Sequence, residues 1–406
     1  MKTSLAVGSM LLSFLLSPSL PVGAQSPTID GQLDAAFYGT PISVQNTPTA
    51  FGNATNGHTR FAVQGSELDA AYARVADGYL YLFIAGNLET YGQGLTWSTG
   101  NQSKLDLFFD TIPGGQGGQG GGLRGDNVDV DSGALAAMGH VDSTNDGLKF
   151  DSGFDADFYI TFYNYTQVVP YFDPPQVEAW RGKLYYATLP TEGNGTSQTL
   201  GTAQDSSHSA FTPTFTFTNG VMLGFNNSNT GGVYGSSDPN AADTSLAAAV
   251  TTGLELAIPI HFLSAPDGSI NENIRIIAFV NDINHRFMSN QVLGPMGQTS
   301  GGYGNLGDPR LFNFSESYSP GDQFFTCSNP YPSARAMLPP DFNTDNTMTH
   351  HWLANVGSSY VLQVATNLLS PTWSNVSETV VATVPTLGST VTNTAPFQFY
   401  RSVRLD

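Results

Sequence analysis

Two apolar segments joined by an Asp-Gly pair constrain the fold of this chain most strongly. Residues 70–75 and 79–85 flank Asp77-Gly78, and such a pair between apolar runs predicts a tight β-hairpin turn. The second segment, YLYLFIA, is rich in aromatic and branched side chains, which suit a half-buried pleated surface. Residues 104–110 then alternate, with one face made by Leu105, Leu107 and Phe109. The pattern predicts antiparallel strands.

The same strand pattern recurs along the chain, whereas helical periodicity does not. Glycine (44) and proline (24) are abundant and only 12% of residues are charged, which favours many strands and turns over helical bundles. We predict strands at 158–165, 211–217, 254–260, 274–280 and 323–327, a hairpin over 177–188 with its turn at 181–183, and polar loops at 192–209, 224–243 and 285–291. The economical architecture is a large jelly-roll-like two-sheet sandwich, with a closed barrel as the alternative.

The chain divides by composition into four parts. Residues 1–24 have one lysine, an apolar run and a small-residue site before Gln25, which is typical of a secretory signal peptide. No later segment approaches the ~20 apolar residues that a membrane span needs. Residues 25–327 form the predicted sandwich domain, 328–340 a Pro-rich linker, and 341–406 a small immunoglobulin-like β-sandwich. The sequence therefore predicts an all-β protein that is secreted or held at the cell surface.

The net charge of −19, from 14 basic and 33 acidic residues, limits the partners. Nucleic-acid binding needs basic side chains that neutralise phosphates, and an anionic membrane or polysaccharide is disfavoured for the same reason. Neutral ligands and divalent cations remain. The single cysteine, Cys327, rules out an internal disulfide and is expected at the end of a buried strand.

An acidic stretch over 124–157 offers candidate metal ligands. Its segment DNVDVD alternates carboxyl and amide oxygens at Asp126, Asp129 and Asp131, and hard cations take oxygen ligands of this kind. The spacing does not match an EF-hand loop. We therefore expect structural calcium at these three residues, with a solvated acidic loop as the alternative.

Aromatic residues in polar surroundings offer candidate sugar platforms, because pyranose rings pack on aromatic faces. Trp97 lies in the polar loop 91–102, and Trp180 lies beside Arg181. We take Trp97, Trp180 and Tyr91 as candidate ligand-binding residues, and other candidates that could join them are Tyr163 and Asn284 or His285. The alternative for each aromatic side chain is packing in the core or on a strand face.

Four short motifs resemble known modules. The segments IDGQLD at 29–34, GYLYL at 78–82, LDLFFD at 105–110 and GLELAIPI at 253–260 resemble family 9 carbohydrate-binding modules and the wider DOMON-like sandwiches. The resemblance implies a jelly-roll sandwich that binds sugars, often with structural calcium. The tail, with YVLQVATNL at 360–368 and FYRSV at 399–403, resembles immunoglobulin or fibronectin-like modules of exported bacterial proteins, which implies a spacer or attachment unit.

An enzyme is the competing class. A jelly-roll glycosidase needs two carboxylates across the scissile bond, and the candidate pairs are Glu67 with Asp69 and Asp106 with Asp110. Neither GxSxG nor HExxH is present. The adjacent His350 and His351 would point to opposite faces of a strand. We therefore expect an exported, non-catalytic protein that recognises a neutral polysaccharide or cell-surface glycan. The alternatives are a structural or adhesive surface protein and a glycoside hydrolase.

Overall fold

The structure is a computed structural model. It describes residues 26–50, 65–89, 103–118, 121–131, 133–140, 146–169, 176–206, 212, 214–235, 242–266, 268–294, 296, 304–316, 321–329, 340–345, 347–354, 359–366, 372–384, 386–392 and 398–404. The predicted signal peptide, residues 1–24, lies outside this set. None of the helices within it has the length and apolar character to cross a membrane.

One antiparallel sheet has six strands in the order β1-β2-β3-β10-β9-β8. The strands are β1 (Ser43–Val44), β2 (Glu67–Ala76), β3 (Tyr79–Asn87), β8 (Phe215–Thr216), β9 (Met222–Phe225) and β10 (Gly253–Pro259). The predicted Asp-Gly hairpin is confirmed, because β2 pairs with β3 across Asp77 (φ 50°) and Gly78 (φ 82°). Positive φ at both positions is the geometry that favours this dipeptide in a two-residue turn.

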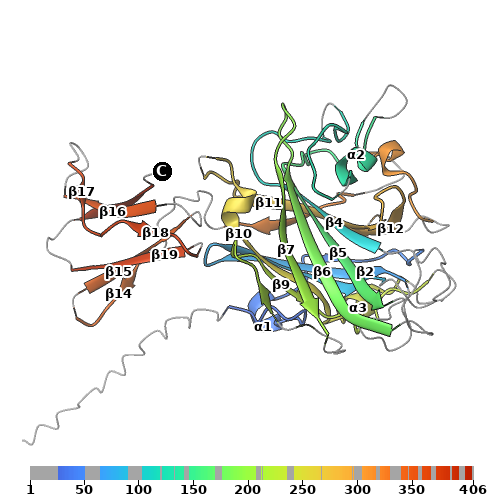
Figure 1. Ribbon diagram of the computed structural model, residues 1–406, viewed down its shortest axis with the longest axis horizontal. Helices are drawn as coiled ribbons and strands as arrows, with labels where there is room; N and C mark the ends of the chain where they lie inside the picture. Colours follow the sequence, from blue (N-terminus) through green and yellow to red (C-terminus); the bar gives the residue numbers. More distant parts are fainter. Residues whose placement is uncertain are drawn as a thin grey trace, which may run out of the picture.

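The facing sheet has seven strands. Six follow the order β12-β11-β4-β5-β6-β7, and β13 pairs with β11. The strands are β4 (Ser103–Asp110), β5 (Phe158–Val169), β6 (Gln176–Thr188), β7 (Ser197–Asp205), β11 (Asn273–Asp282), β12 (Met288–Leu293) and β13 (Phe325–Ser328). Figure 1 shows β5, β6 and β7 side by side. Cys327 is buried on β13, as expected.

The largest core lies between these two sheets. It takes Leu105, Leu107 and Phe109 from β4, while the intervening Phe108 belongs to a second core. The period-2 alternation predicted for this strand is confirmed. Burying a large apolar side chain contributes about 1.5–3 kcal/mol, so the alternation fixes which face of β4 turns inward.

Connecting segments cover the outer face of each sheet (Figure 1). The short helix α1 (Ala35–Tyr38) packs Phe37 and Tyr38 on aromatic residues of β2 and β3. On the other side, α2 (Ala134–Met138) and the turn η2 (Pro309–Leu311) lie over the seven-stranded sheet, where Phe108 is joined by Leu135, Met138, Tyr159, Phe279, Phe312 and Phe314. The central strands β3, β4 and β10 are therefore buried on both faces.

The predicted hairpin over 177–188 is wrong, because these residues form one strand, β6. Gly182, assigned to a turn from its sequence, lies instead against the side chains of Trp180 and Phe162. A Cβ at Gly182 would lie 2.6 Å from Trp180 Cη2 and 3.0 Å from Phe162 Cε2. The glycine therefore makes room for an indole ring in the core and does not reverse the chain.

Two strands lie in segments predicted to be polar loops. β7 is at the edge of its sheet and alternates between exposed and covered positions. β12 is buried throughout, although it carries Ser289, Asn290 and Gln291. The Asn290 amide donates to Pro48 O (2.7 Å) and accepts from Ala50 N (3.0 Å). Hydrogen bonds from a distant segment make this polar strand tolerable in the interior.

Residues 340–404 form two further antiparallel sheets, of three and four strands. Their strands are β14 (Asp341–Phe342), β15 (Thr347–Leu353), β16 (Ser359–Ala365), β17 (Ser374–Asn375), β18 (Val380–Val381), β19 (Thr386–Thr392) and β20 (Phe399–Arg404). Trp352 and Leu362 are fully buried between them. On β15, His350 contacts the Tyr400 ring, whereas His351 bonds to Asp341 (3.0 Å).

The all-β class and the packing of antiparallel sheets that the sequence predicts are confirmed. The two sheets of the large sandwich are separate, and each has end strands. The helical elements of the described residues are short: α1, α2, η1 (Ile260–Leu263), η2 and α3 (Thr244–Ala248). The finer assignment to a jelly roll and an immunoglobulin-like module stays a prediction.

Candidate functional site

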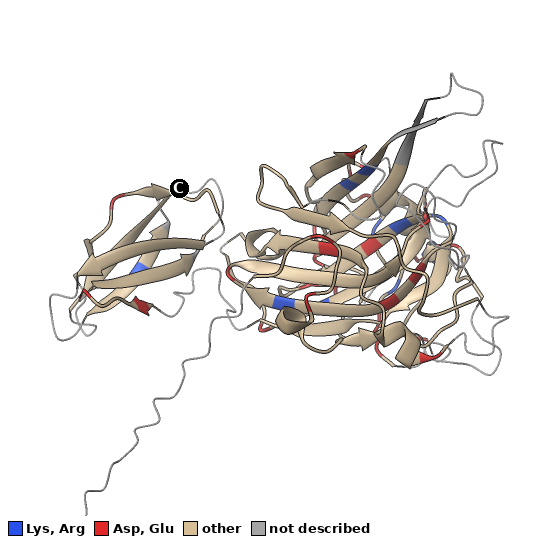
Figure 2. Cartoon of the chain, turned by 90° about the horizontal axis from the view of Figure 1, so that it is seen from below, with Lys and Arg blue, Asp and Glu red and all other residues tan. Residues whose placement is uncertain are grey.

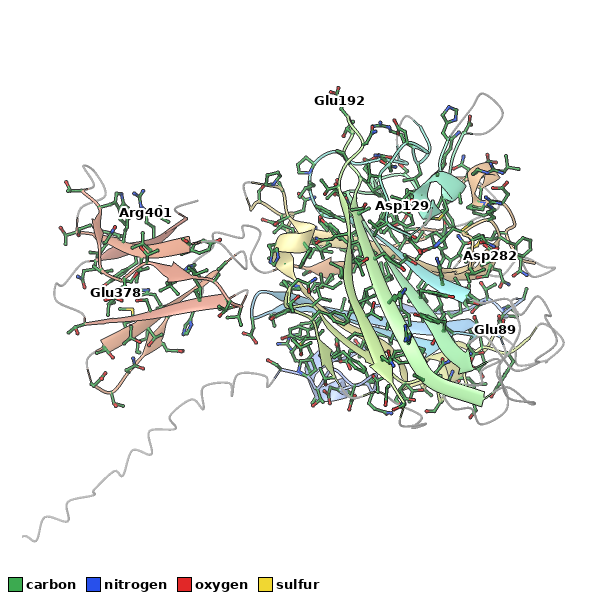
Figure 3. All side chains as sticks on the ribbon, viewed as in Figure 1. Glu89, Asp129, Glu192, Asp282, Glu378 and Arg401 are labelled. Atoms are coloured by element: carbon green, nitrogen blue, oxygen red, sulfur yellow. The ribbon has the colours of Figure 1, made fainter. Side chains whose placement is uncertain are left out.

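A pocket of about 700 Å³ opens at one end of the large sandwich, where β4 and β6 finish and β5 begins. The turn η1, which follows β10, forms another wall. Figure 3 labels Glu192, next to the lining residue Thr191, at this end of the molecule. The walls include the apolar side chains of Ile112, Pro113, Phe158, Tyr186, Leu189, Pro190 and Pro266, and hydroxyls of Thr188, Thr191, Thr196 and Ser264.

Two side-chain hydrogen bonds tie η1 to the sheet and so shape the pocket. Thr111 Oγ1, just after β4, donates to Leu263 O (2.7 Å). Tyr186 OH, near the end of β6, donates to Phe262 O (2.8 Å). Both acceptors are main-chain carbonyls of η1, which is too short to satisfy its own groups. The pocket wall is therefore fixed by sheet residues.

Asp157 immediately precedes β5 and is 4% exposed. Its Oδ2 accepts from the main-chain N–H groups of Thr111 (2.7 Å) and Ile112 (2.9 Å). Its Oδ1 is buried and has no partner among the described atoms. Burial raises the pKa of Asp157 to about 8 against the lowering effect of the two N–H bonds, and Asp110 and Asp155 add to the rise. At neutral pH the carboxyl is mostly protonated, and Oδ1 is the oxygen left to carry the proton.

His261 is the second titratable group of the pocket. Burial lowers its pKa to about 4, so the imidazole is neutral at physiological pH. Its ring lies against Phe262, with 4.5 Å between ring centroids. The Nδ1 atom is buried and lacks a hydrogen-bond partner in the described structure. A buried polar group left unsatisfied costs about 1–3 kcal/mol, which makes both Asp157 and His261 candidates for contact with a ligand.

The pocket is therefore uncharged at neutral pH although it contains an acid and an imidazole. Its described lining residues include neither lysine nor arginine. Apolar walls with a few hydrogen-bonding groups are typical of small-molecule sites, and about 700 Å³ lies within their usual size range. The arrangement favours an uncharged, hydroxyl-bearing ligand over an anion or a cation.

Of the residues predicted to bind a glycan, the structure describes Trp180, and this residue does not line the pocket. Trp97 and Tyr91 lie outside the described residues. Trp180 is fully buried: its Nε1 donates to Asn164 Oδ1 (2.5 Å), and its ring stacks on Phe225 at 5.6 Å. The expectation that Trp180 is exposed is wrong, because the indole fills the core beside Gly182 and has no free face. Tyr163 is partly buried and stacks on Tyr165 (4.7 Å).

The three acids predicted to bind calcium have separate partners. Asp126 forms a two-point ion pair with Arg124 (3.0 and 2.8 Å). Asp129 accepts from the main-chain N–H groups of Gly133 and Leu135 at the start of α2. Asp131 contacts Lys104 Nζ (2.5 Å) and His285 Nε2 (3.0 Å). In the part of the chain that is described, no three His, Cys, Asp or Glu side chains are grouped to hold a metal ion.

His285 and Asp106, one member of a predicted catalytic pair, belong to a buried network of charged side chains. His285 Nδ1 lies 2.9 Å from Asp106 Oδ2, and Tyr159 OH donates to Asp106 Oδ1 (2.7 Å). Burial alone would lower the pKa of His285, but the charge and hydrogen bonds of Asp106 and the bond to Asp131 raise it. Burial would likewise raise the pKa of Asp106, yet the His285 charge and hydrogen bonds lower it.

The network contains two cations, Lys104 and His285, and two carboxylates, those of Asp106 and Asp131. Such a balance of charges is typical of a structural ion cluster. Asp110 pairs with Arg275 (2.9 Å) instead. Asp106 and Asp110 therefore do not face each other as a catalytic pair. No local sequence pattern marks the pocket, because Asp157 and His261 are 104 positions apart, one before β5 and the other in η1.

The chain has no match to any protein-family model. It likewise has no significant match to a curated protein or to a solved structure.

Proposed function

We propose that this chain is an exported, non-catalytic protein that binds a neutral glycan in the pocket beside η1. The observation that carries the proposal is that a protonated Asp157 and a neutral His261 both line one uncharged pocket with apolar walls. Sugar hydroxyls can donate to Nδ1 and exchange hydrogen bonds with a carboxyl that is both donor and acceptor. The flat apolar faces suit the C–H surface of a pyranose ring.

Two alternatives from the sequence are less well supported by this geometry. A glycoside hydrolase needs two carboxyl groups facing the scissile bond, whereas the described lining of the pocket contributes Asp157 alone. A purely structural or adhesive role gives no reason for an acid and an imidazole with unsatisfied buried atoms in one cavity. Binding without catalysis accounts for both observations.

The test is a polysaccharide pull-down and glycan array with residues 25–406, followed by affinity measurement from pH 6 to pH 9.5. We expect binding by the wild-type chain to weaken as pH rises through about 8, because ionised Asp157 loses its O–H donor. Asp157→Asn keeps an uncharged donor and acceptor, so its affinity should be nearly independent of pH. Asp157→Ala should lose binding while the fold is retained, as judged by circular dichroism.

The matched control is Asp345→Asn, which removes an exposed acid between β14 and β15, outside the residues that line the pocket, and should leave affinity unchanged. Binding that survives Asp157→Ala but disappears in Trp97→Ala would contradict the pocket and return the site to the loop predicted from sequence. Failure to bind any polysaccharide would favour the structural or adhesive alternative.

A further inference from the structure

A bulge in β2 brings two acidic side chains together at the opposite end of the sandwich. Leu68 pairs with Gly86 and Ala70 with Ala85, so Asp69 is an extra residue in β2. One amide shows that Glu67 and Asp69 converge, because Asn229 Nδ2 donates to Glu67 Oε1 (2.8 Å) and to Asp69 Oδ2 (3.1 Å). Bulges often occur where a strand must re-aim a side chain next to a site.

Both carboxyl groups are almost completely removed from water. Glu67 is 1% exposed and Asp69 is 0% exposed. Asp69 Oδ1 accepts from Val233 N (2.8 Å). The covering loop approaches so closely that a Cβ at Gly232, whose φ is +106°, would collide with the Asp69 carboxylate. The loop thus encloses the two acids, and glycine is required where it touches them.

Two oxygen atoms of this enclosure accept no hydrogen bond from any described residue. Glu67 pairs directly with Asn87 on β3, and side chains of opposed residues lie on the same face with Cβ atoms about 4.5–5.5 Å apart. Asn87 Nδ2 donates to Gly65 O (2.9 Å), which fixes the amide orientation. Glu67 Oε2 and Asn87 Oδ1 are both buried without a partner among the described residues. Asn87 is 2% exposed.

Among the described residues, no positively charged side chain pairs with either acid of the enclosure. The hydrogen bonds to Glu67 and Asp69 come from an amide and a main-chain N–H, and no lysine, arginine or histidine of the described chain forms an ion pair with either acid. Asp131, by contrast, is buried beside Lys104 and His285. Buried carboxylates are normally paired with a cation or bound to a metal. The two acids are therefore short of a counter-charge.

We propose that Glu67, Asp69 and Asn87 form a binding site for a hard divalent cation, best matched by Ca²⁺. The set supplies two carboxylates and an amide oxygen, the ligand types that Ca²⁺ prefers, and Ca²⁺ accepts irregular geometry and added main-chain carbonyls or water. The cation would satisfy both unpartnered oxygens and supply the missing charge. This site uses none of the residues of the Asp126–Asp131 loop. It is also independent of the glycan proposal, because the two sites lie at opposite ends of the sandwich. Figure 3 labels Glu89, which is near Asn87, at one end and Glu192, which is near the pocket, at the other.

The test measures Ca²⁺ binding and the melting temperature of residues 25–406 after treatment with a chelator. For the wild-type chain we expect saturable binding by calorimetry and a rise in melting temperature of several degrees when Ca²⁺ is added, since a ligand of the folded state stabilises it. Glu67→Gln should weaken Ca²⁺ affinity about tenfold or more. The controls Asp126→Asn and Asp129→Asn should leave the affinity unchanged.

The variant also separates a metal site from a merely structural role. Without Ca²⁺, Glu67→Gln should melt at the same temperature as the wild type or higher, because one of two repelling carboxylates is gone. With Ca²⁺ the order should reverse. A wild-type chain that neither binds Ca²⁺ nor changes its melting temperature would overturn the proposal, as would loss of binding in Asp126→Asn or Asp129→Asn but not in Glu67→Gln.

Discussion

At the scale of single residues, burial decides what each acid does. Asp126 is exposed and held by Arg124, Asp131 is buried between two cations, and Asp157 is buried beside no cation in the described structure. The three residue environments give an ordinary surface pair, a structural ion cluster and a protonated acid, respectively. The sequence shows where the acids are, but their partners come from other elements.

The ion cluster gives a stability prediction. Asp106→Asn should destabilise the fold by about 3–5 kcal/mol, because it leaves His285 and its neighbours without a buried counter-charge. Asp110→Asn, on the same strand, should cost clearly less, because its partner Arg275 is 36% exposed. Urea unfolding of both variants checks this. Equal losses for the two variants would show that the cluster contributes no more than a surface-linked pair.

The same cluster has a defined pH window. The folded pKa of His285 is raised, so its stabilisation is present at low pH and is lost as pH rises through that pKa. The folded pKa of Asp106 is lowered, so its stabilisation is lost as pH falls through that value. The cluster should therefore stabilise the protein most at pH values between the two.

At the scale of elements, runs and alternation of apolar residues located strands correctly, whereas polar composition wrongly predicted loops. β3, β4 and β11 lie where branched and aromatic residues alternate or run together. β7 and β12 were missed because their polar side chains are tolerated for reasons outside the segment: an edge position for β7, and hydrogen bonds from residues 48–50 for β12. A segment's own composition does not contain those partners.

Gly182 gives a prediction at this scale. Gly182→Ala should destabilise the protein by about 1–3 kcal/mol, because the new methyl group would overlap the Trp180 ring and force the core to shift. Gly304→Ala is the matched control, since no described atom beyond its chain neighbours lies within 4 Å of its Cβ position. Thermal unfolding followed by tryptophan fluorescence would detect the difference. If both variants melt with the wild type, Gly182 is not needed for packing.

At the scale of the whole molecule, a strongly acidic chain encloses an uncharged pocket. Figure 2 shows the basic residues in blue among the more numerous acidic residues in red. The net charge of −19 repels anions and opposes the compact state. Neutral ligands do not feel this repulsion, which is consistent with the uncharged lining of the pocket beside η1.

The salt dependence of the melting temperature and of glycan affinity tests whether an acidic chain encloses an uncharged pocket. Raising NaCl from about 0.01 to 0.15 M shortens the Debye length from about 30 to 8 Å, so we expect the melting temperature to rise as the acidic residues are screened. Affinity for the neutral glycan should change little over the same range. A steep fall in affinity with salt would mean that the ligand is charged and would contradict the uncharged pocket.

The sequence by itself determined the all-β class, the Asp-Gly hairpin, the inward face of β4 and the acidic character. Those features depend on neighbouring residues and on totals, because turn geometry and a period of two are local properties. Only the tertiary structure decided that Trp180 is core, that Asp157 and His261 line one pocket, and that Glu67 faces Asn87. Each of these features arises because strands that are distant in the sequence pack together. This packing changes the solvent exposure, the partners and the pKa of a side chain, although the neighbouring residues in the sequence stay the same.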